Sequence, residues 1–221
     1  RYLTFSNQFD VTLFKKLVLT AVYDYRQRDN LFKYRNNTFE YSRQQGVVET
    51  FTSGSVENSY REIHQTYKGH NVNIYGTYEN SWGGHNLKIT AGGQYEDYRS
   101  TSLDAKQTDL SSDDIDSFTV ATGPITLSQS ITAYRTLGFF GRVNYDYKGR
   151  YIFEASARGD GSSRFESDHR WGFFPSASAA WRISEESFFT PARDIVDNLK
   201  LRLSVGSLGN QQVSNYAYIC L

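Results

Sequence analysis

Apolar and polar residues alternate with a period of two through residues 136–207, in four successive segments. In the first segment the apolar set is Leu137, Phe139, Gly141, Val143, Tyr145 and Tyr147. The positions between them include Arg142, Asn144 and Asp146. Because successive side chains of a β-strand point to opposite faces, this pattern predicts a sheet with one apolar and one polar, often charged, face. A sheet of this kind is typical of a transmembrane β-barrel.

The same alternation predicts strands along the whole chain. The strand-like stretches are 1–13, 17–28, 71–79, 86–98, 136–147, 150–160, 171–183 and 198–207. Short connections are expected at 14–16, 80–85 and 148–149, and long ones at 29–70, 99–135 and 161–170. Short periplasmic turns that alternate with long external loops are the layout of an outer-membrane barrel. The exception is 184–197, where Phe188, Phe189, Ile195 and Val196 between polar edges predict a short periplasmic helix.

Composition narrows the class of protein. The mean hydropathy is −0.59, and no run approaches the roughly 20 apolar residues that a transmembrane helix needs. Aromatic residues make up 16% of the chain and Pro occurs three times, which suits long strands and aromatic girdles. The 24 basic and 24 acidic residues balance, so charge gives no reason to expect a nucleic-acid partner. Cys220 is the single cysteine, which excludes an internal disulfide.

Charged residues at the polar positions are expected to face the barrel lumen or a plug, because an Arg or Lys facing lipid at the midplane costs about 2–4 kcal/mol. The lumen-facing candidates in the last four segments are Arg142, Asp146, Glu154, Arg158, Arg182, Lys200 and Arg202. Those near the periplasmic end are expected to contact the plug, and those near the external loops the substrate. Asp160 and Arg164 are candidates in the external loop.

Aromatic residues divide into a group expected to contact lipid and a group expected in the external loops. Those expected to contact outer-membrane lipid are Tyr145, Tyr147, Tyr151, Trp171, Phe173 and Trp181. Those expected in external loops, where a ring could stack on a sugar, are Tyr34, Phe39, Tyr41, Tyr60, Tyr67, Phe118 and Tyr134.

Residues 139–211 carry specific motifs. They read FGRVNY at 140–145, KGRY at 148–151, RGDGSSRF at 158–165, GFFPS at 172–176, WRISEE at 181–186, LKLR at 199–202 and GSLGNQ at 206–211. This stretch resembles the SusC/RagA family of TonB-linked outer-membrane transporters, whereas residues 1–135 match only in pattern and layout.

The resemblance implies an all-β fold: an antiparallel transmembrane barrel of 22 strands, of which this chain would supply about eight. It implies TonB-dependent import of glycans or peptides across the outer membrane, with a SusD-like surface lipoprotein as lid. On this reading residues 1–221 are part of the barrel domain, while the plug, the TonB-contacting N-terminal region and the closing strands are absent. It implies neither a cofactor nor catalysis in this segment.

Several local patterns have weaker functional readings. The run Gly159–Arg164 looks like a phosphate-binding loop but lacks the Gly-Lys-Ser/Thr ending and a following helix, so a turn is expected. Asp109, Asp113, Asp114 and Asp116 leave a calcium site open, although their spacing lacks the Gly and Glu of a calcium hand. The four histidines have no zinc-ligand spacing, and no catalytic constellation can be assembled.

Other protein classes remain as alternatives. A barrel hydrolase would need an acid, base or nucleophile cluster at the outer rim. A complete eight-stranded barrel could serve a structural or adhesion role. A soluble carbohydrate-binding sandwich would bury Trp171 and Trp181 in a dry core and leave the inward charges unexplained.

Overall fold

A computed structural model of the chain describes residues 1–51, 58–112 and 114–209. Its strands are β1 (Tyr2–Leu13), β2 (Leu17–Asn36), β3 (Phe39–Gln44), β4 (Val47–Phe51), β5 (Ser59–Trp82), β6 (His85–Thr108), β7 (Ile125–Tyr147), β8 (Tyr151–Ser162), β9 (Trp171–Arg182) and β10 (Lys200–Gly206). Its 3₁₀ helices are η1 (Phe118–Val120), η2 (Ser167–His169), η3 (Ile183–Glu185) and η4 (Ser187–Ala192). Among the described residues, no helix is long and apolar enough to cross a membrane.

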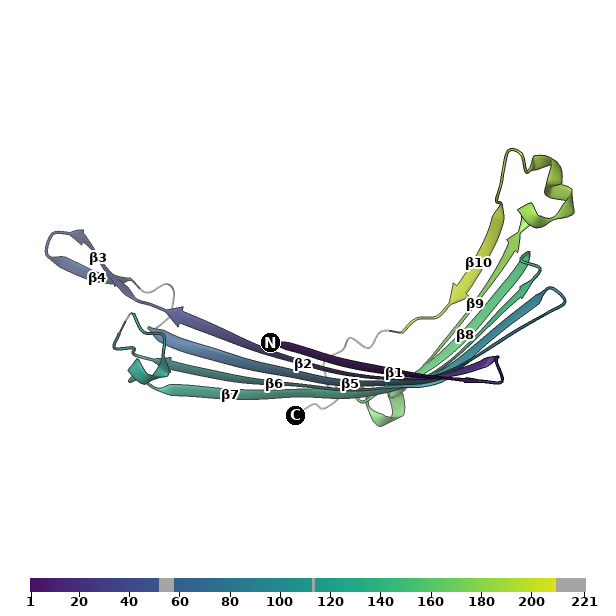
Figure 1. Cartoon of the computed structure of the whole chain (residues 1–221). Coiled ribbons are helices and arrows are strands. Elements are labelled where there is room, and N and C mark those ends of the chain that lie inside the picture. Colours follow the sequence, from purple (N-terminus) through teal and green to yellow (C-terminus); the bar gives the residue numbers. More distant parts are fainter. Residues whose placement is uncertain (52–57, 113, 210–221) are drawn as a thin grey trace. The chain divides into compact units, whose positions relative to one another are not determined.

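Eight of these strands form one open sheet in the order β1-β2-β5-β6-β7-β8-β9-β10 (Figure 1). Each strand therefore pairs with its neighbour in the chain, except that the β3-β4 hairpin is inserted between β2 and β5. The pairs β7-β8, β8-β9 and β9-β10 are antiparallel. The eight-stranded, all-β prediction is confirmed.

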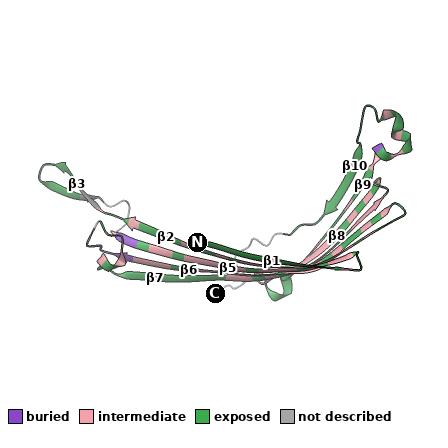
Figure 2. Cartoon of the chain, viewed as in Figure 1, coloured by how far each residue is buried: buried purple, intermediate pink, exposed green. Residues whose placement is uncertain are grey.

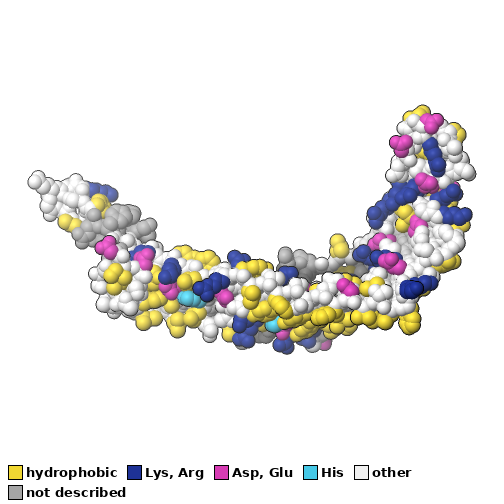
Figure 3. Space-filling model, viewed as in Figure 1, with side chains coloured by type: hydrophobic (Ala, Val, Ile, Leu, Met, Phe, Trp, Pro, Cys, Tyr) yellow, Lys and Arg dark blue, Asp and Glu magenta, His cyan; other side chains and the backbone are white. Residues whose placement is uncertain are grey.

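The register of β7 to β10 confirms the two faces predicted from the sequence. Paired residues of an antiparallel ladder point to the same face. Val143 pairs with Ala155, which pairs with Ala177, which pairs with Val205. One residue along, Arg142 pairs with Ser156, which pairs with Ser176. Figure 3 shows hydrophobic side chains gathered side by side along the sheet, and Lys and Arg side chains gathered near β9 and β10.

Several strands are longer than predicted. β2 continues to Asn36, β5 begins at Ser59, β6 continues to Thr108 and β7 begins at Ile125. In β2, β5 and β6 the apolar alternation ends where one face stops being apolar, but the strand continues without it. In β7 the odd positions Ile125, Leu127, Ile131 and Ala133 remain apolar, so this extension follows the same alternation as the rest of the strand. The long connections are therefore shorter than expected, and the first contains the β3-β4 hairpin.

The longer strands also correct the placement of the external-loop aromatics. Four of the seven lie in strands of the eight-stranded sheet: Tyr34 in β2, Tyr60 and Tyr67 in β5, and Tyr134 in β7. Phe39 and Tyr41 lie in β3, which is still within the connection between β2 and β5. Phe118 lies in η1. Tyr60 is only 1% exposed, so it is a packing residue and its ring is closed to a sugar.

The chain divides into two compact units. The first unit contains Arg1–Leu3, Arg26–Lys68 and Arg99–Thr132. Its buried centre is Tyr60, whose ring meets that of Phe118 edge to face at 4.9 Å. The Arg35 guanidinium donates to the carbonyls of Ser112 and Ile115. These contacts fold the connection between β6 and β7 into a defined structure.

The second unit contains Thr4–Tyr25, Gly69–Tyr98 and Ala133–Leu221. Its apolar face is uncovered: Phe173 is 68% exposed and Val205 75% exposed. All of β10 is exposed (Figure 2). Each buried aliphatic or aromatic side chain is worth about 1.5–3 kcal/mol, so a face left uncovered in water would forfeit much of the stabilisation available to the fold.

Tight turns join the strands at one end of the second unit. The turn after β5 uses Gly83 and Gly84 (φ 54° and 88°), and the turn after β7 uses Lys148 and Gly149 (φ 52° and 70°). Left-handed residues at both central positions match the twist of a two-residue hairpin. The short connections predicted at 80–85 and 148–149 are confirmed, and so is the one at 14–16.

The connection between β9 and β10 contains helical turns, as predicted. They are the 3₁₀ helices η3 and η4, and Pro191 lies inside η4. Strand β9 ends at Arg182, one residue earlier than expected. Asp113, Cys220 and the end of the GSLGNQ motif lie outside the described residues.

Candidate functional site

The candidate site is the polar face of β6 to β10 in the second unit. The register brings all seven lumen-facing candidates to one face of the sheet: Arg142, Asp146, Glu154, Arg158, Arg182, Lys200 and Arg202. Asp146 and Arg182 lie at the tight-turn end of their strands, and Arg182 pairs with Lys200 in the ladder. Arg158 lies toward the other end of β8.

Glu154 is the centre of one polar cluster on this face. Its carboxylate accepts a hydrogen bond from Asn144 Nδ2 at 2.8 Å and lies 3.8 Å from Arg142 Nε. Ser156 and Ser176, one rung further, are joined by a hydroxyl hydrogen bond of 2.7 Å. These partners allow charged groups to occupy the sheet surface without an isolated charge.

Arg158 is the centre of a second cluster. Its Nε donates to both carboxylate oxygens of Asp160, at 2.8 and 2.7 Å, and its Nη2 donates to Gln94 Oε1 at 2.9 Å. Its guanidinium also lies 6.0 Å from the centre of the Phe140 ring. A Cβ atom on Gly138 would contact Asp160 and would approach Arg158 Nη2 to 2.9 Å. The glycine therefore leaves room for this ion pair.

The two external-loop candidates occupy different places. Asp160 lies within β8, because the ladder continues through Gly161 and Ser162 opposite Leu137 and Thr136. Its assignment to a loop is corrected. Arg164 lies in the connection after β8, and its guanidinium lies 3.9 Å from the centre of the Tyr134 ring. That distance is typical of a close cation–π contact.

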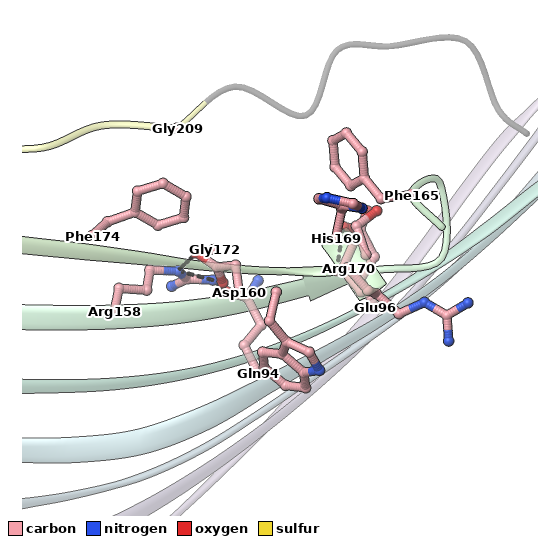
Figure 4. Close-up of a pocket in the computed structure, with 13 residues that line it drawn as sticks. Gln94, Glu96, Arg158, Asp160, Phe165, His169, Arg170, Gly172, Phe174 and Gly209 are labelled. Carbon is pink, nitrogen blue, oxygen red and sulfur yellow. Dashed lines mark hydrogen bonds and ion pairs between the residues drawn. The ribbon is translucent and has the colours of Figure 1, made fainter. Parts of the chain in front are cut away.

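A cavity of about 400 Å³ lies beside the Arg158–Asp160 pair (Figure 4). Its polar lining includes Gln94, Glu96, Thr136, Arg158, Asp160, Ser162, His169 and Arg170. Its aromatic lining is Phe165, Trp171 and Phe174. Glu96 accepts a hydrogen bond from Tyr134 Oη at 3.3 Å. Donors, acceptors and flat rings around one cavity suit a polar ligand with several hydroxyl or amide groups.

Part of the lining of this cavity could not be predicted from the sequence. Phe174 is an aromatic residue at a polar-face position, so the alternation gave no reason to single it out. His169 and Arg170 come from the connection between β8 and β9, where no periodicity applies. The polar alternation of 86–98 did place Gln94 on the correct face, but its contact with Arg158 depends on a register across three strands.

No group of three or more His, Cys, Asp or Glu residues within the described ranges is arranged to hold a metal ion. Asp113 is outside those ranges.

Comparisons with known proteins agree with this geometry. The family model described as "TonB dependent receptor-like, beta-barrel" matches residues 1–218. The TonB-dependent receptor SusC of Bacteroides thetaiotaomicron is 36% identical over 154 residues, which cover 67% of this chain and 15% of SusC. The TonB-dependent receptor P3 of Formosa agariphila is 34% identical over 144 residues, covering 64% of this chain and 14% of the receptor.

Solved structures show the same fold. A structure of the RagAB peptide transporter superposes with a TM-score of 0.72 at 21% identity, covering 97% of this chain and 24% of that one. The chain thus spans about 15% of the curated relatives and about a quarter of the matched structure. With its uncovered apolar face and charged opposite face, the chain belongs to the TonB-dependent receptor-like β-barrel family and forms part of the wall of a SusC-like outer-membrane barrel.

Proposed function

We propose that this barrel wall serves TonB-dependent import of oligosaccharides or other large, polymer-derived nutrients. The observation that carries the proposal is the division of the sheet: an uncovered apolar face for lipid and an opposite face that combines ion pairs with a polar, aromatic-lined cavity. The similarity to SusC favours a glycan, and the RagAB peptide transporter makes a peptide the competing substrate.

The tight-turn end of the polar face suits contact with a plug supplied by another part of the protein. Arg182 and Lys200 are paired in the ladder there, and Arg202 follows one rung along the same face. Arg182 Nε is buried and has no hydrogen-bond partner among the described residues. A buried donor of this kind costs about 1–3 kcal/mol if it stays unpaired.

The other end of the face suits the substrate. The Arg158–Asp160 pair and Gln94 offer fixed donors and acceptors, and Phe174 adds an aromatic surface (Figure 4). A SusD-like surface lipoprotein would deliver the substrate, and TonB would act through the N-terminal region beyond this chain. Transport of this kind requires no catalytic residue and no cofactor in the wall.

Uptake by the full-length transporter tests the proposal. Arg158→Gln removes a charge-assisted hydrogen bond worth about 1.5–3 kcal/mol, so uptake of a labelled oligosaccharide at limiting concentration should fall about tenfold or more. Arg135→Gln is the matched control, because its 2.8 Å pair with Asp97 is exposed and lies outside the cavity lining. Equal uptake by both variants and the parent would overturn the assignment of this cavity to the substrate.

A competition assay separates the substrate classes. Excess unlabelled oligosaccharide should block uptake, whereas excess mixed peptides should not. Block by peptides alone would identify a peptide transporter. Release of cleaved product without uptake would instead favour the hydrolase alternative. The eight-stranded structural barrel is less favoured because its sheet would have to close on itself, while this sheet is open.

A further inference from the structure

A row of aromatic side chains crosses the tight-turn end of the apolar face in the second unit. Trp82 stacks on His85 with ring centres 5.4 Å apart, and His85 lies 4.6 Å from Tyr147. Tyr147 stacks on Tyr151 at 6.5 Å. Tyr151 is paired in the ladder with Trp181. Aromatic rows of this kind mark the level at which a barrel leaves the hydrocarbon core and enters the headgroup region.

The row continues beyond the sheet into the connection between β9 and β10. The ring of Phe188, in η4, meets that of Trp181 edge to face at 6.3 Å. Phe188 is nevertheless 64% exposed. An exposed aromatic side chain at the end of an interfacial row is placed to contact the same lipid boundary as the row itself.

Glu186 fixes this connection to the row. One carboxylate oxygen accepts hydrogen bonds from Tyr151 Oη at 2.7 Å and from Trp181 Nε1 at 3.0 Å. The other lies 3.4 Å from the Arg150 guanidinium. The Tyr151 hydroxyl, followed by the Trp181 indole and the Arg150 charge, holds the pKa of Glu186 below its ordinary value. The Glu186 side chain is only 12% exposed, so this is an ordered tie between the connection and two strands.

The tight turns beside the row carry lysine side chains. The turn after β1 contains Lys15 and Lys16, and the turn after β7 contains Lys148, while Arg150 is paired with Glu186. The connection that holds Phe188 itself carries Glu185, Glu186, Asp194 and Asp197. Lys148 Nζ lies 5.3 Å from the centre of the Tyr147 ring, directly beside the row. Cations next to interfacial aromatics complement the phosphate groups of phospholipids.

We propose that Glu186–Ala192 is a membrane-surface anchor, in which the tie through Glu186 holds Phe188 in the boundary between the headgroups and acyl chains of a phospholipid leaflet. The occupant is lipid because the Phe188 surface continues the lipid-facing row and the neighbouring turns carry positive charge. The anchor would fix the height of β8 and β9 in the membrane at their tight-turn end.

Depth measurement in a bilayer tests this anchor. The full-length transporter, with native cysteines replaced by serine, is spin-labelled at Phe188→Cys in vesicles of phosphatidylethanolamine and phosphatidylglycerol. The label should collide more often with oxygen, which concentrates in lipid, than with a water-soluble nickel chelate. A label at Ser187→Cys, the neighbouring exposed position of η4, is the matched control and should favour the chelate.

A second pair of variants tests whether Glu186 holds the connection against β8 and β9. Glu186→Ala should shift the label at position 188 toward the chelate. Glu185→Ala should leave it unchanged, because Glu185 pairs with the exposed Arg193, at 3.6 Å, and not with the aromatic row. Equal chelate access at positions 187 and 188 would overturn the proposal. Protection of position 188 from both reagents would show a protein occupant and would also overturn it. Neither outcome depends on which nutrient the transporter imports.

Discussion

Individual glycines set how closely neighbouring strands approach. A Cβ atom on Gly92, in β6, would clash with the backbone of β5, including Tyr75 Cα at 2.7 Å. The same addition on Gly141, in β7, would meet nothing within 4 Å. The two positions share a residue type but differ completely in the space around them.

Gly92→Ala should therefore lower the free energy of unfolding of the full-length protein by about 1–3 kcal/mol, because backbone atoms of the next strand must move. Gly141→Ala serves as the control and should change it by less than about 0.5 kcal/mol. Urea unfolding in detergent measures both values. Equal stability of the two variants would show that the β5-β6 approach is looser than described.

The charge state of Glu186 should control whether the connection between β9 and β10 stays tied to Tyr151 and Trp181. The pKa of Glu186 is lowered in the folded state from an ordinary value of 4.5, so the tie is fully formed above about pH 4.5 and is lost as the pH falls through the lower folded value. The lipid preference of a label at position 188 should stay constant from neutral pH to about pH 5 and decline below pH 4.5. Glu186→Gln should remove this dependence on pH. A decline that persists in Glu186→Gln would assign it to another group.

At the scale of the element, alternation of apolar and polar residues predicts a strand only where its two faces differ. It predicted β7 to β10 and their faces, because their odd and even positions meet different surroundings. It missed the long extensions of β2, β5 and β6, which carry polar residues on both faces. Within the site, alternation placed Arg158 and Asp160 correctly on one face. It could not reveal Phe174 or the connection residues His169 and Arg170, which depend on register and loop folding.

The extension of β5 supports the connection between β6 and β7 through Tyr60. Tyr60 is almost fully buried against Phe118 and donates a hydrogen bond to Glu62 at 2.6 Å. Tyr60→Ala should destabilise this packing by about 3–5 kcal/mol, as large aromatic truncations do. Limited proteolysis should then cut residues 109–124 much faster in the variant.

Leu127→Ala is the matched control, because Leu127 is 66% exposed in the same unit. Its cleavage rate should equal that of the parent protein. Unchanged cleavage in Tyr60→Ala would mean that the connection is held by other contacts.

At the scale of the whole molecule, the sheet leaves an apolar face and two strand edges uncovered. Its first and last strands, β1 and β10, are edges of the open sheet. Unpaired edges and an uncovered apolar face favour association between chains. Residues 1–221 expressed alone should aggregate, and size-exclusion chromatography in detergent measures this. A monodisperse, heat-modifiable and protease-resistant barrel formed by this chain alone would contradict the expectation.

We propose that one face of this wall meets lipid while the other lines an aqueous passage for a nutrient. A cysteine scan along β9 (Trp171–Arg182) in the full-length transporter, embedded in vesicles, tests it most directly. Even-numbered positions should react with a water-soluble thiol reagent and, near Gly172 and Phe174, be protected by bound oligosaccharide. Odd-numbered positions from Phe173 to Trp181 should resist that reagent and respond to lipid-soluble quenchers, whereas Trp171 lines the cavity and is left out of this comparison. Reactivity without a two-residue period, or aqueous access at the odd-numbered positions, would contradict the account.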